Sequence, residues 1–235
     1  MIRFLQTARA AFFDLLFPHT CAACGSSLLQ TGKGICSSCL LQLPLTGFTN
    51  DSDNAVARVF WGRLSLHQAT AFIFFQKKTS VQELMHQIKY RSREDAARQL
   101  GQWMGHQLLH KPWFMESDLL LPMPLHAKRL KSRGFNQAAV LCEGISSVTG
   151  IPMRNDLLQR QSSTSSQTTQ HRQERWQNMQ GVFALRDPLS LENKKLVLVD
   201  DVVTTGATLE ALGRAVAAVP GTRISIACLA YTLPY

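Results

Sequence analysis

Two adjacent carboxylates follow a short apolar run in the segment VLVDDVVTTGAT, which spans Val197 to Thr208. The apolar run is typical of a buried parallel strand, and we expect this strand to end at Asp200 and Asp201. The residues from Thr204 onward then lead into a helix. Backbone N–H groups at a helix start, a glycine that permits close approach and threonine hydroxyls can together bind a phosphate without a lysine.

Asp200 and Asp201 would repel a phosphate, so they need a different partner. Vicinal sugar hydroxyls and a hydrated magnesium ion both suit acidic oxygen acceptors. A sugar that carries a phosphate would satisfy the carboxylates and the following loop at once. The simpler interpretation is a capped helix start with acidic residues that complement the helix dipole. That interpretation accounts for Thr205 or Thr208, but not for two carboxylates at the end of a buried strand.

Four cysteines near the N-terminus have the spacing C-x2-C-x11-C-x2-C. Each pair can supply two thiolates from a tight turn, and four sulfur ligands complete the tetrahedral coordination of zinc. Because no coordination position is left open, we expect structural zinc whose binding supplies much of the folding free energy of this lobe. The predicted ligands are Cys21, Cys24, Cys36 and Cys39. The remaining cysteines, Cys142 and Cys228, lie in apolar segments and are expected in the core.

The segments that must position these residues alternate between strand and helix patterns. Strands are predicted over 69–75, 118–124, 195–201 and 223–233, and helices over 80–90, 94–110, 138–148 and 207–219. We expect Ser80 to cap the first helix, and the basic segment 125–137 to be a loop. The alternation predicts an α/β fold with a parallel sheet, whose sites lie at the carboxyl ends of its strands.

The chain is expected to contain a small N-terminal unit, residues 1–54, and a larger domain, residues 55–235. Residues 40–54 have the composition of a linker. The first 18 residues begin like a signal peptide, but Arg9 and Asp14 interrupt the apolar run, so we expect an amphipathic helix packed on the body. No stretch approaches the roughly 18 apolar residues of a membrane span. These features predict a cytoplasmic protein.

Positive charge is concentrated in the middle of the chain. The net charge is +9 at pH 7, and the residues between Trp61 and Asn178 include 16 basic and 8 acidic side chains. Such a region suits a phosphorylated metabolite, a nucleic acid, or both, because each gains from a focused positive potential. A basic face that is merely solvated is the alternative.

The segment from Val197 to Thr208 resembles the phosphoribosyl pyrophosphate (PRPP) signature of type I phosphoribosyltransferases. The resemblance implies that Asp200 and Asp201 hold the ribose 2- and 3-hydroxyls, with magnesium, while the following loop binds the 5-phosphate. The loop residues implied are Val203, Thr204, Thr205, Gly206, Ala207 and Thr208.

From Phe17 to the C-terminus, the order of motifs resembles the ComF family, which includes competence protein FC and its enterobacterial relative GntX. Between the zinc site and the PRPP motif lie the segments IKYRSR, PMPLHAKRLKSRGFNQA and QSSTSSQTTQHRQERWQNMQGVF. The matching positions are Lys89, Tyr90, Arg129, Arg133, Gly134, Phe135, Asn136, Gln137, Thr164, Gln167, Arg175 and Asn178. The resemblance implies a type I phosphoribosyltransferase fold with a small N-terminal four-cysteine zinc-ribbon lobe.

The chemistry of the cations at these positions suggests roles for them. Arg133, on a mobile loop that Gly134 allows to bend, would close over the pyrophosphate; a surface arginine that binds no phosphate is the alternative. Lys89 would be its counterpart on the opposite wall, although a lysine at a helix end can equally serve the helix dipole. Arg172 and Arg175 are three residues apart, so on a helix they would share a face and add contacts to an anion. Ordinary solvated charges are the alternative. The residues expected to take part in catalysis are Asp200, Asp201, Arg133 and Lys89.

Two hypotheses follow for the function. In the first, the chain binds PRPP and transfers the phosphoribosyl group to an unidentified acceptor, in the use of imported DNA and in contact with single-stranded DNA and uptake proteins. In the second, it is a non-catalytic module that senses a nucleotide metabolite and binds DNA or protein. No segment reads as a clamp for a nucleobase acceptor, and no general base is assigned. A gluconate role follows from a family name alone.

Overall fold

The computed structural model describes residues 20–27, 33–161 and 182–233. The amphipathic helix predicted over the first 18 residues lies outside the described residues. So do the positions Thr164, Gln167, Arg172, Arg175 and Asn178 of the polar segment.

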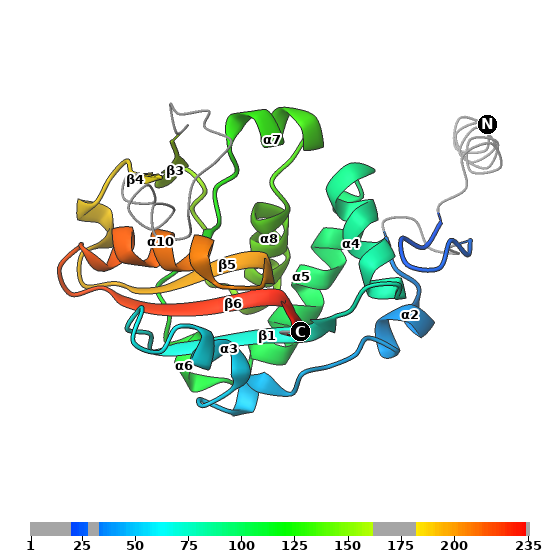
Figure 1. The fold of residues 1–235 in the computed structure, drawn as a ribbon, viewed down its shortest axis with the longest axis horizontal. Helices are drawn as coiled ribbons and strands as arrows, with labels where there is room; N and C mark the ends of the chain where they lie inside the picture. Colours follow the sequence, from blue (N-terminus) through cyan, green and yellow to red (C-terminus); the bar gives the residue numbers. More distant parts are fainter. Residues whose placement is uncertain (1–19, 28–32, 162–181, 234–235) are drawn as a thin grey trace, which may run out of the picture.

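A parallel sheet of four strands forms the centre of the molecule, in the order β1-β6-β5-β2 (Figure 1). Every neighbouring pair in it runs parallel, which confirms the fold class expected from the alternating pattern. The strands are β1 (Gln68–Phe75), β2 (Leu119–Pro122), β5 (Lys195–Val203) and β6 (Arg223–Thr232). A second sheet pairs β3 (Leu158–Arg160) antiparallel with β4 (Phe183–Leu185).

Helices cover both faces of the parallel sheet, and each face has its own core. Along β5, Val197 and Val199 pack in the cluster that contains residues of α4, α5 and α8. The alternate residues, Leu196 and Leu198, pack in the cluster that contains residues of α3 and α10. This alternation follows from the two-residue period of a strand. The helices are α3 (Ala55–Val59), α4 (Ser80–Tyr90), α5 (Glu94–Leu108), α8 (Gln137–Thr149) and α10 (Ala207–Ala217).

The remaining elements are short and lie in the connections. They are α2 (Ser37–Leu41), η1 (Phe48–Asn50), α6 (Pro112–Met115), α7 (Ala127–Arg133) and η2 (Leu189–Leu191). The segment predicted as a linker pairs with the outer edge of β1: Thr46 N–H donates to the Phe72 carbonyl at 3.0 Å, and Phe74 N–H donates to the Pro44 carbonyl at 2.8 Å. The linker segment therefore covers an edge that would otherwise expose unpaired backbone groups. The division at residue 54 stays a prediction.

Three local predictions were wrong. The basic segment 125–137 contains helix α7, which His126 caps by accepting from Lys128 N–H and which ends at Gly134 with φ +82°. The sequence AKRLKSR contains no helix breaker, so the helix continues until a glycine takes the left-handed conformation. Strand β5 passes through Asp201 and ends at Val203, because two more residues pair with β6. The N-cap residue of α4 is Thr79. Ser80, which was expected to be the cap, is the first residue of the helix.

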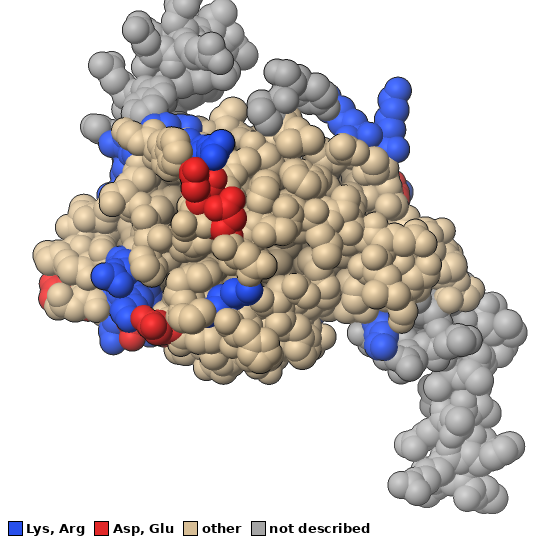
Figure 2. All heavy atoms as spheres, turned by 90° about the horizontal axis from the view of Figure 1, so that it is seen from below, with Lys and Arg blue, Asp and Glu red and all other residues tan. Residues whose placement is uncertain are grey.

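The side of the molecule on which α3 and α6 lie at the bottom of Figure 1 carries few charged side chains. Figure 2 shows that most of its surface is neither Lys or Arg nor Asp or Glu, and that the charged residues form small groups. Among the described residues, no helix combines the length and apolar character needed to cross a membrane.

Candidate functional site

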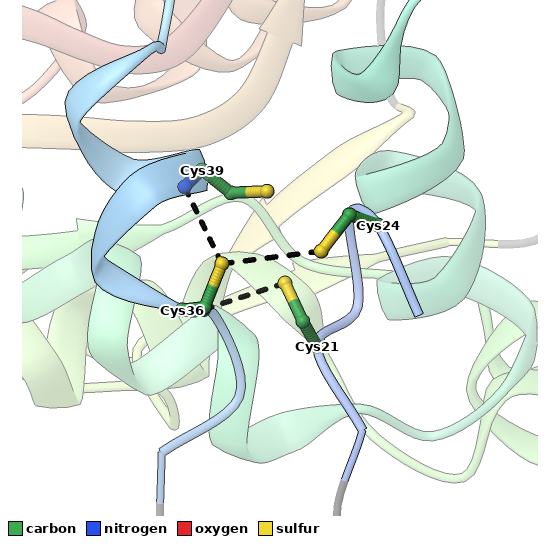
Figure 3. Close-up of side chains that lie close together, drawn as sticks. All are labelled: Cys21, Cys24, Cys36 and Cys39. Carbon is green, nitrogen blue, oxygen red and sulfur yellow. Dashed lines mark hydrogen bonds between the residues drawn. The ribbon is translucent and has the colours of Figure 1, made fainter. Parts of the chain in front are cut away.

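The four N-terminal cysteines meet at one point, although no secondary-structure element contains more than one of them. Their Sγ atoms all lie within 4.8 Å of one another (Figure 3). The Cys24 and Cys36 sulfurs are 3.9 Å apart, close to the roughly 3.8 Å between two sulfurs on a tetrahedral zinc with Zn–S bonds of about 2.3 Å. Backbone N–H groups of Cys36 and Cys39 donate to Cys21 Sγ and Cys36 Sγ, at 3.3 and 3.4 Å.

The thiols differ in how readily they ionise. Hydrogen bonds from Ser26 lower the pKa of Cys24 to about 6, and the Cys39 backbone N–H lowers the pKa of Cys36. Burial and the neighbouring sulfurs raise the pKa of Cys39. Four sulfurs this close cannot all ionise without a cation among them, and a divalent zinc ion supplies that charge. The donor set therefore fits structural zinc.

The cysteine lobe is fixed to helix α5. The Arg93 guanidinium donates to the carbonyl oxygens of Thr20 and Gly34, at 2.7 and 3.2 Å. Gln99 accepts from the N–H groups of Gly34 and Ile35, at 3.0 and 2.8 Å, and donates to the Ile35 carbonyl at 3.0 Å. Because α5 begins just after the turn that follows Tyr90, the lobe is joined to the second group of predicted site residues.

That second group gathers at the carboxyl end of β5. The Lys89 ammonium, at the end of α4, lies 2.8 Å from Asp201 Oδ2. The contact follows from the strand period, since Asp201 is on the same face as Val197 and Val199, the face that α4 covers. Burial, and then the negative charge of Asp201, raise the pKa of Asp200 to about 8, while Lys89 acts in the opposite direction.

The segment from Arg133 to Gln137 lies against the end of α4. The Arg133 guanidinium is 5.7 Å from the centre of the Tyr90 ring, and its Nη1 donates to Gln137 Oε1 at 2.9 Å. The Ser92 hydroxyl donates to the Arg133 carbonyl at 3.5 Å. Arg133 is the last residue of α7 rather than part of a glycine loop. Two cations from separate elements are nevertheless brought to one end of the sheet.

The other predicted substrate-binding residues differ in their exposure to solvent. Asn136 accepts from the Ala138 N–H at 3.1 Å and donates to the Met123 carbonyl at 3.0 Å, so it caps α8 and ties it to the end of β2. Gln137 is buried and hydrogen-bonded at both ends. Tyr90 and Arg129 are exposed. Substrate contacts at all four positions stay predictions.

Residues 204–208, which we call the 204–208 loop, follow β5 and include the first two residues of α10. Thr204 and Thr205 are exposed, and Gly206 precedes the helix with φ +71°. The Glu210 N–H donates to the Gly206 carbonyl at 2.8 Å, which closes the first turn of α10. Within the described part of the chain, the N–H groups of residues 205–209 have no protein acceptor. A phosphate site needs such unpaired donors, and phosphate binding at these residues stays a prediction.

Sequence reasoning missed two arginines beside the predicted site. Arg160, on β3, holds its guanidinium 5.6 Å from the centre of the Phe183 ring; burial, and then the positive charge of Arg129, lower its pKa, while Asp200 raises it. Arg63 donates to the carbonyl oxygen of Thr205. Neither arginine belongs to a motif, and each reaches the site only through tertiary packing, so the sequence offered no signal for them.

Two family models match different parts of the chain. The family described as "Phosphoribosyl transferase domain" matches residues 133–233. The family described as "Double zinc ribbon domain" matches residues 12–48, which include the four cysteines.

Curated relatives match over a longer part of the chain. DNA utilization protein YhgH of Escherichia coli K12 is 28% identical over 153 residues, which are 64% of this chain and 66% of that protein. The match thus spans slightly less than two thirds of the length of YhgH. Competence protein F of Haemophilus influenzae is 28% identical over 199 residues, 84% of this chain and 78% of that protein.

Solved structures share weaker similarity with this chain. The purine phosphoribosyltransferase of Pyrococcus horikoshii is 19% identical with a TM-score of 0.37, over 57% of this chain and 72% of that one. The glutamine PRPP amidotransferase of B. subtilis is 17% identical with a TM-score of 0.40, over 60% of this chain and 30% of that one.

Proposed function

The chain, with a zinc ribbon ahead of a phosphoribosyltransferase domain, belongs to the ComF family, and on this premise we propose that it binds PRPP in the handling of imported DNA. The DNA part of the proposal rests on the names of two relatives, DNA utilization protein and Competence protein F. The PRPP part rests on the site at the carboxyl end of β5.

The Lys89–Asp201 contact of 2.8 Å is the observation that carries the PRPP proposal. It joins a cation from one motif to a carboxylate of another, across 112 positions of sequence. PRPP needs three neighbouring subsites: hydroxyl acceptors for the ribose, donors for the 5-phosphate, and cations for the pyrophosphate. Asp200 and Asp201 supply the first and the 204–208 loop the second.

Cations supply the third subsite. Lys89 and Arg133 lie at the adjoining ends of α4 and α7, and the exposed Arg129 is on the same α7. The half-buried Arg160 adds a guanidinium within electrostatic reach of Arg129 and Asp200. Because two of these cations repel each other, a polyanion between them would relieve an unfavourable interaction. A bidentate guanidinium suits phosphate oxygens.

Magnesium fits the same carboxylates. Asp200 and Asp201 offer the oxygen ligands that Mg²⁺ prefers, and a divalent cation would offset the repulsion by which Asp201, after burial, raises the pKa of Asp200. Bound there with PRPP, the ion would offset negative charge on the leaving pyrophosphate. The protein's own residues orient the ribose through its hydroxyls and hold the two phosphate ends apart.

A calorimetric titration of the chain with PRPP and Mg²⁺ tests the proposal. We expect binding to the wild type, and at least tenfold weaker binding to a D200A/D201A variant, since lost hydrogen bonds to charged groups cost about 1.5–3 kcal/mol each. Glu143→Ala removes a partly exposed carboxylate of α8 and serves as the matched control. Absent binding, or equal binding by D200A/D201A, contradicts the proposal.

Transfer is distinguished from sensing by the fate of the bound PRPP. Release of pyrophosphate in the presence of nucleobases or single-stranded DNA, abolished in D200A/D201A, supports a transferase. Tight binding without release supports a sensor. The donor site is common to both hypotheses, so this assay separates them without altering the proposed ligand.

We further propose that single-stranded DNA contacts helix α7. Lys128, Arg129 and Lys131 are exposed on it, whereas the face in Figure 2 carries few charges. Since phosphate contacts release counterions, binding should weaken steeply with salt. R129E/K131E should bind more weakly than wild type, while Lys194→Glu, a change at an exposed residue just before β5, should not. Binding that ignores salt, or an unaffected R129E/K131E, contradicts the DNA contact.

A further inference from the structure

The 204–208 loop rests on the turn that follows α3. A Cβ atom added at Gly206 would lie 2.6 Å from Val59 Cγ1 and 2.8 Å from Phe60 Cε1. Arg63 Nη1 donates to the carbonyl oxygens of Val59 and Thr205, both at 2.9 Å. We call Val59, Phe60 and Arg63 the loop socket. The socket holds the back of the loop, while the Thr205 side chain remains exposed.

The bond from Arg63 to the Thr205 carbonyl also sets the direction of an N–H group. The Thr205 C=O and the Gly206 N–H belong to one trans peptide and point in opposite directions. Because Arg63 holds the oxygen toward the socket, the Gly206 N–H is directed away from it. Among the described residues this N–H has no acceptor. It is therefore offered to a ligand on the open side of the loop.

Arg63 is itself fixed by helix α10. Its Nε donates to Glu210 Oε2 at 2.8 Å, and Nη2 forms a second bond to the same oxygen. Glu210 is only 4% exposed and lies in the first turn of α10. Arg214 Nε donates to its other oxygen at 3.0 Å. Two guanidinium groups thus offset a carboxylate that would otherwise repel an anion at the start of this helix.

We propose that Arg63 is a positioning residue for the 5-phosphate of PRPP. It does not touch the ligand: it holds the Thr205–Gly206 peptide so that the N–H faces the phosphate, and it offsets the charge of Glu210. This inference rests on the proposed donor site. Without Arg63 the peptide is free to turn, and the phosphate loses a donor.

Separate titrations with ribose 5-phosphate and with Mg²⁺-pyrophosphate test the proposal. We expect R63A to bind ribose 5-phosphate about tenfold more weakly, as for a lost charge-assisted hydrogen bond. Its affinity for pyrophosphate should be unchanged, because that ligand would face Lys89 and Arg133. R63K should recover part of the loss, since an ammonium keeps the charge but lacks the planar fork.

Arg58→Ala is the matched control. Arg58 lies on α3 and forms an exposed ion pair with Asp53 at 2.9 Å, so its removal leaves the loop socket intact. We expect R58A to bind both ligands like the wild type. A residue with a merely structural role would lower both affinities together, so the split between the two ligands identifies positioning.

A double variant covers the case in which R63A fails to fold because Glu210 loses a partner. R63M/E210Q removes both charges and should show the same selective loss. Unchanged affinity for ribose 5-phosphate in a folded variant, or an equal loss for both ligands, overturns the role of Arg63. A wild type that binds none of ribose 5-phosphate, pyrophosphate and PRPP overturns the proposed function instead.

Discussion

The zinc lobe and the carboxyl end of β5 place charged groups together in opposite ways. The four sulfurs come from one segment of 19 residues, Cys21 to Cys39, and they face one another. The groups around Asp200 come from α4, α7, β3 and β5, and they include both cations and carboxylates. The lobe uses its donors on one ion, whereas the N–H groups of residues 205–209 have no protein acceptor among the described residues.

The two regions are nevertheless connected. Arg93 and Gln99 bind the lobe to α5, and Ser92, one residue before Arg93, donates to the Arg133 carbonyl. The turn between α4 and α5 is thus held by the lobe on one side and by α7 on the other. Through this turn, the four-cysteine lobe supports the arrangement of residues at the carboxyl end of β5.

Loss of zinc is expected to have the largest effect. Cys36→Ser removes one of four ligands, and zinc content should fall from about one ion per chain to near zero, because a closed four-sulfur site depends on the full set. The lobe should lose its fold, since metal binding supplies much of its stability. Elemental analysis and proteolysis measure both effects, with Cys142→Ser as a control outside the lobe. If the lobe resists protease without metal, its fold does not depend on zinc and the account is contradicted.

Crowding at the open site should give the next largest effect. Gly206→Ala places a side chain at φ +71° and against Val59 and Phe60, so we expect at least a tenfold loss of PRPP affinity and a stability loss of about 1–3 kcal/mol. Gly47→Ala is matched, because Gly47 has φ +74° with nothing within 4 Å of an added Cβ. It should lose stability through the backbone strain alone and keep its affinity. If G206A binds PRPP like G47A, the loop is not the phosphate site.

The pKa of Asp200 predicts a pH dependence of stability. Since the pKa is raised to about 8 in the folded chain and is about 3.9 when unfolded, the folded state binds more protons between these values. The unfolding free energy should therefore fall as pH rises from about 4 to about 8. Asp200→Asn should lack this fall and gain about 1 kcal/mol or more over wild type at pH 8, in urea titrations. Asp53→Asn, at an exposed carboxyl, should show no such gain. Parallel curves for wild type and D200N would contradict the raised pKa.

Coupling between the two regions should give the smallest effect. Arg93→Ala removes the bonds to Thr20 and Gly34 and should lower PRPP affinity a few-fold, about 1 kcal/mol, by loosening the turn after Tyr90. Arg98→Ala, on the same α5 but paired at the surface with Glu143, should leave affinity unchanged. Calorimetry on both variants measures the difference. Equal affinities for R93A and wild type would show that the lobe does not support the open site.

The contrast also explains what could be predicted from the sequence. The zinc ligands follow from local spacing, and the strands and helices from periodicity. The position of Arg133 was missed because helix α7 depends on where a glycine ends it, not on charge. The neutral tendency of Asp200 depends on burial by elements distant in sequence, and the bond from Arg63 to Thr205 joins residues 142 positions apart. Such features depend on tertiary packing, so they cannot be predicted from a local sequence motif.

A structure determined with PRPP and Mg²⁺ bound is the most direct test of the donor site. We expect the ribose hydroxyls on Asp200 and Asp201, the 5-phosphate within hydrogen-bond distance of the Gly206 N–H, and the pyrophosphate beside Lys89 and Arg133. PRPP bound away from the carboxyl end of β5, or with its pyrophosphate on the 204–208 loop, would contradict the assignment.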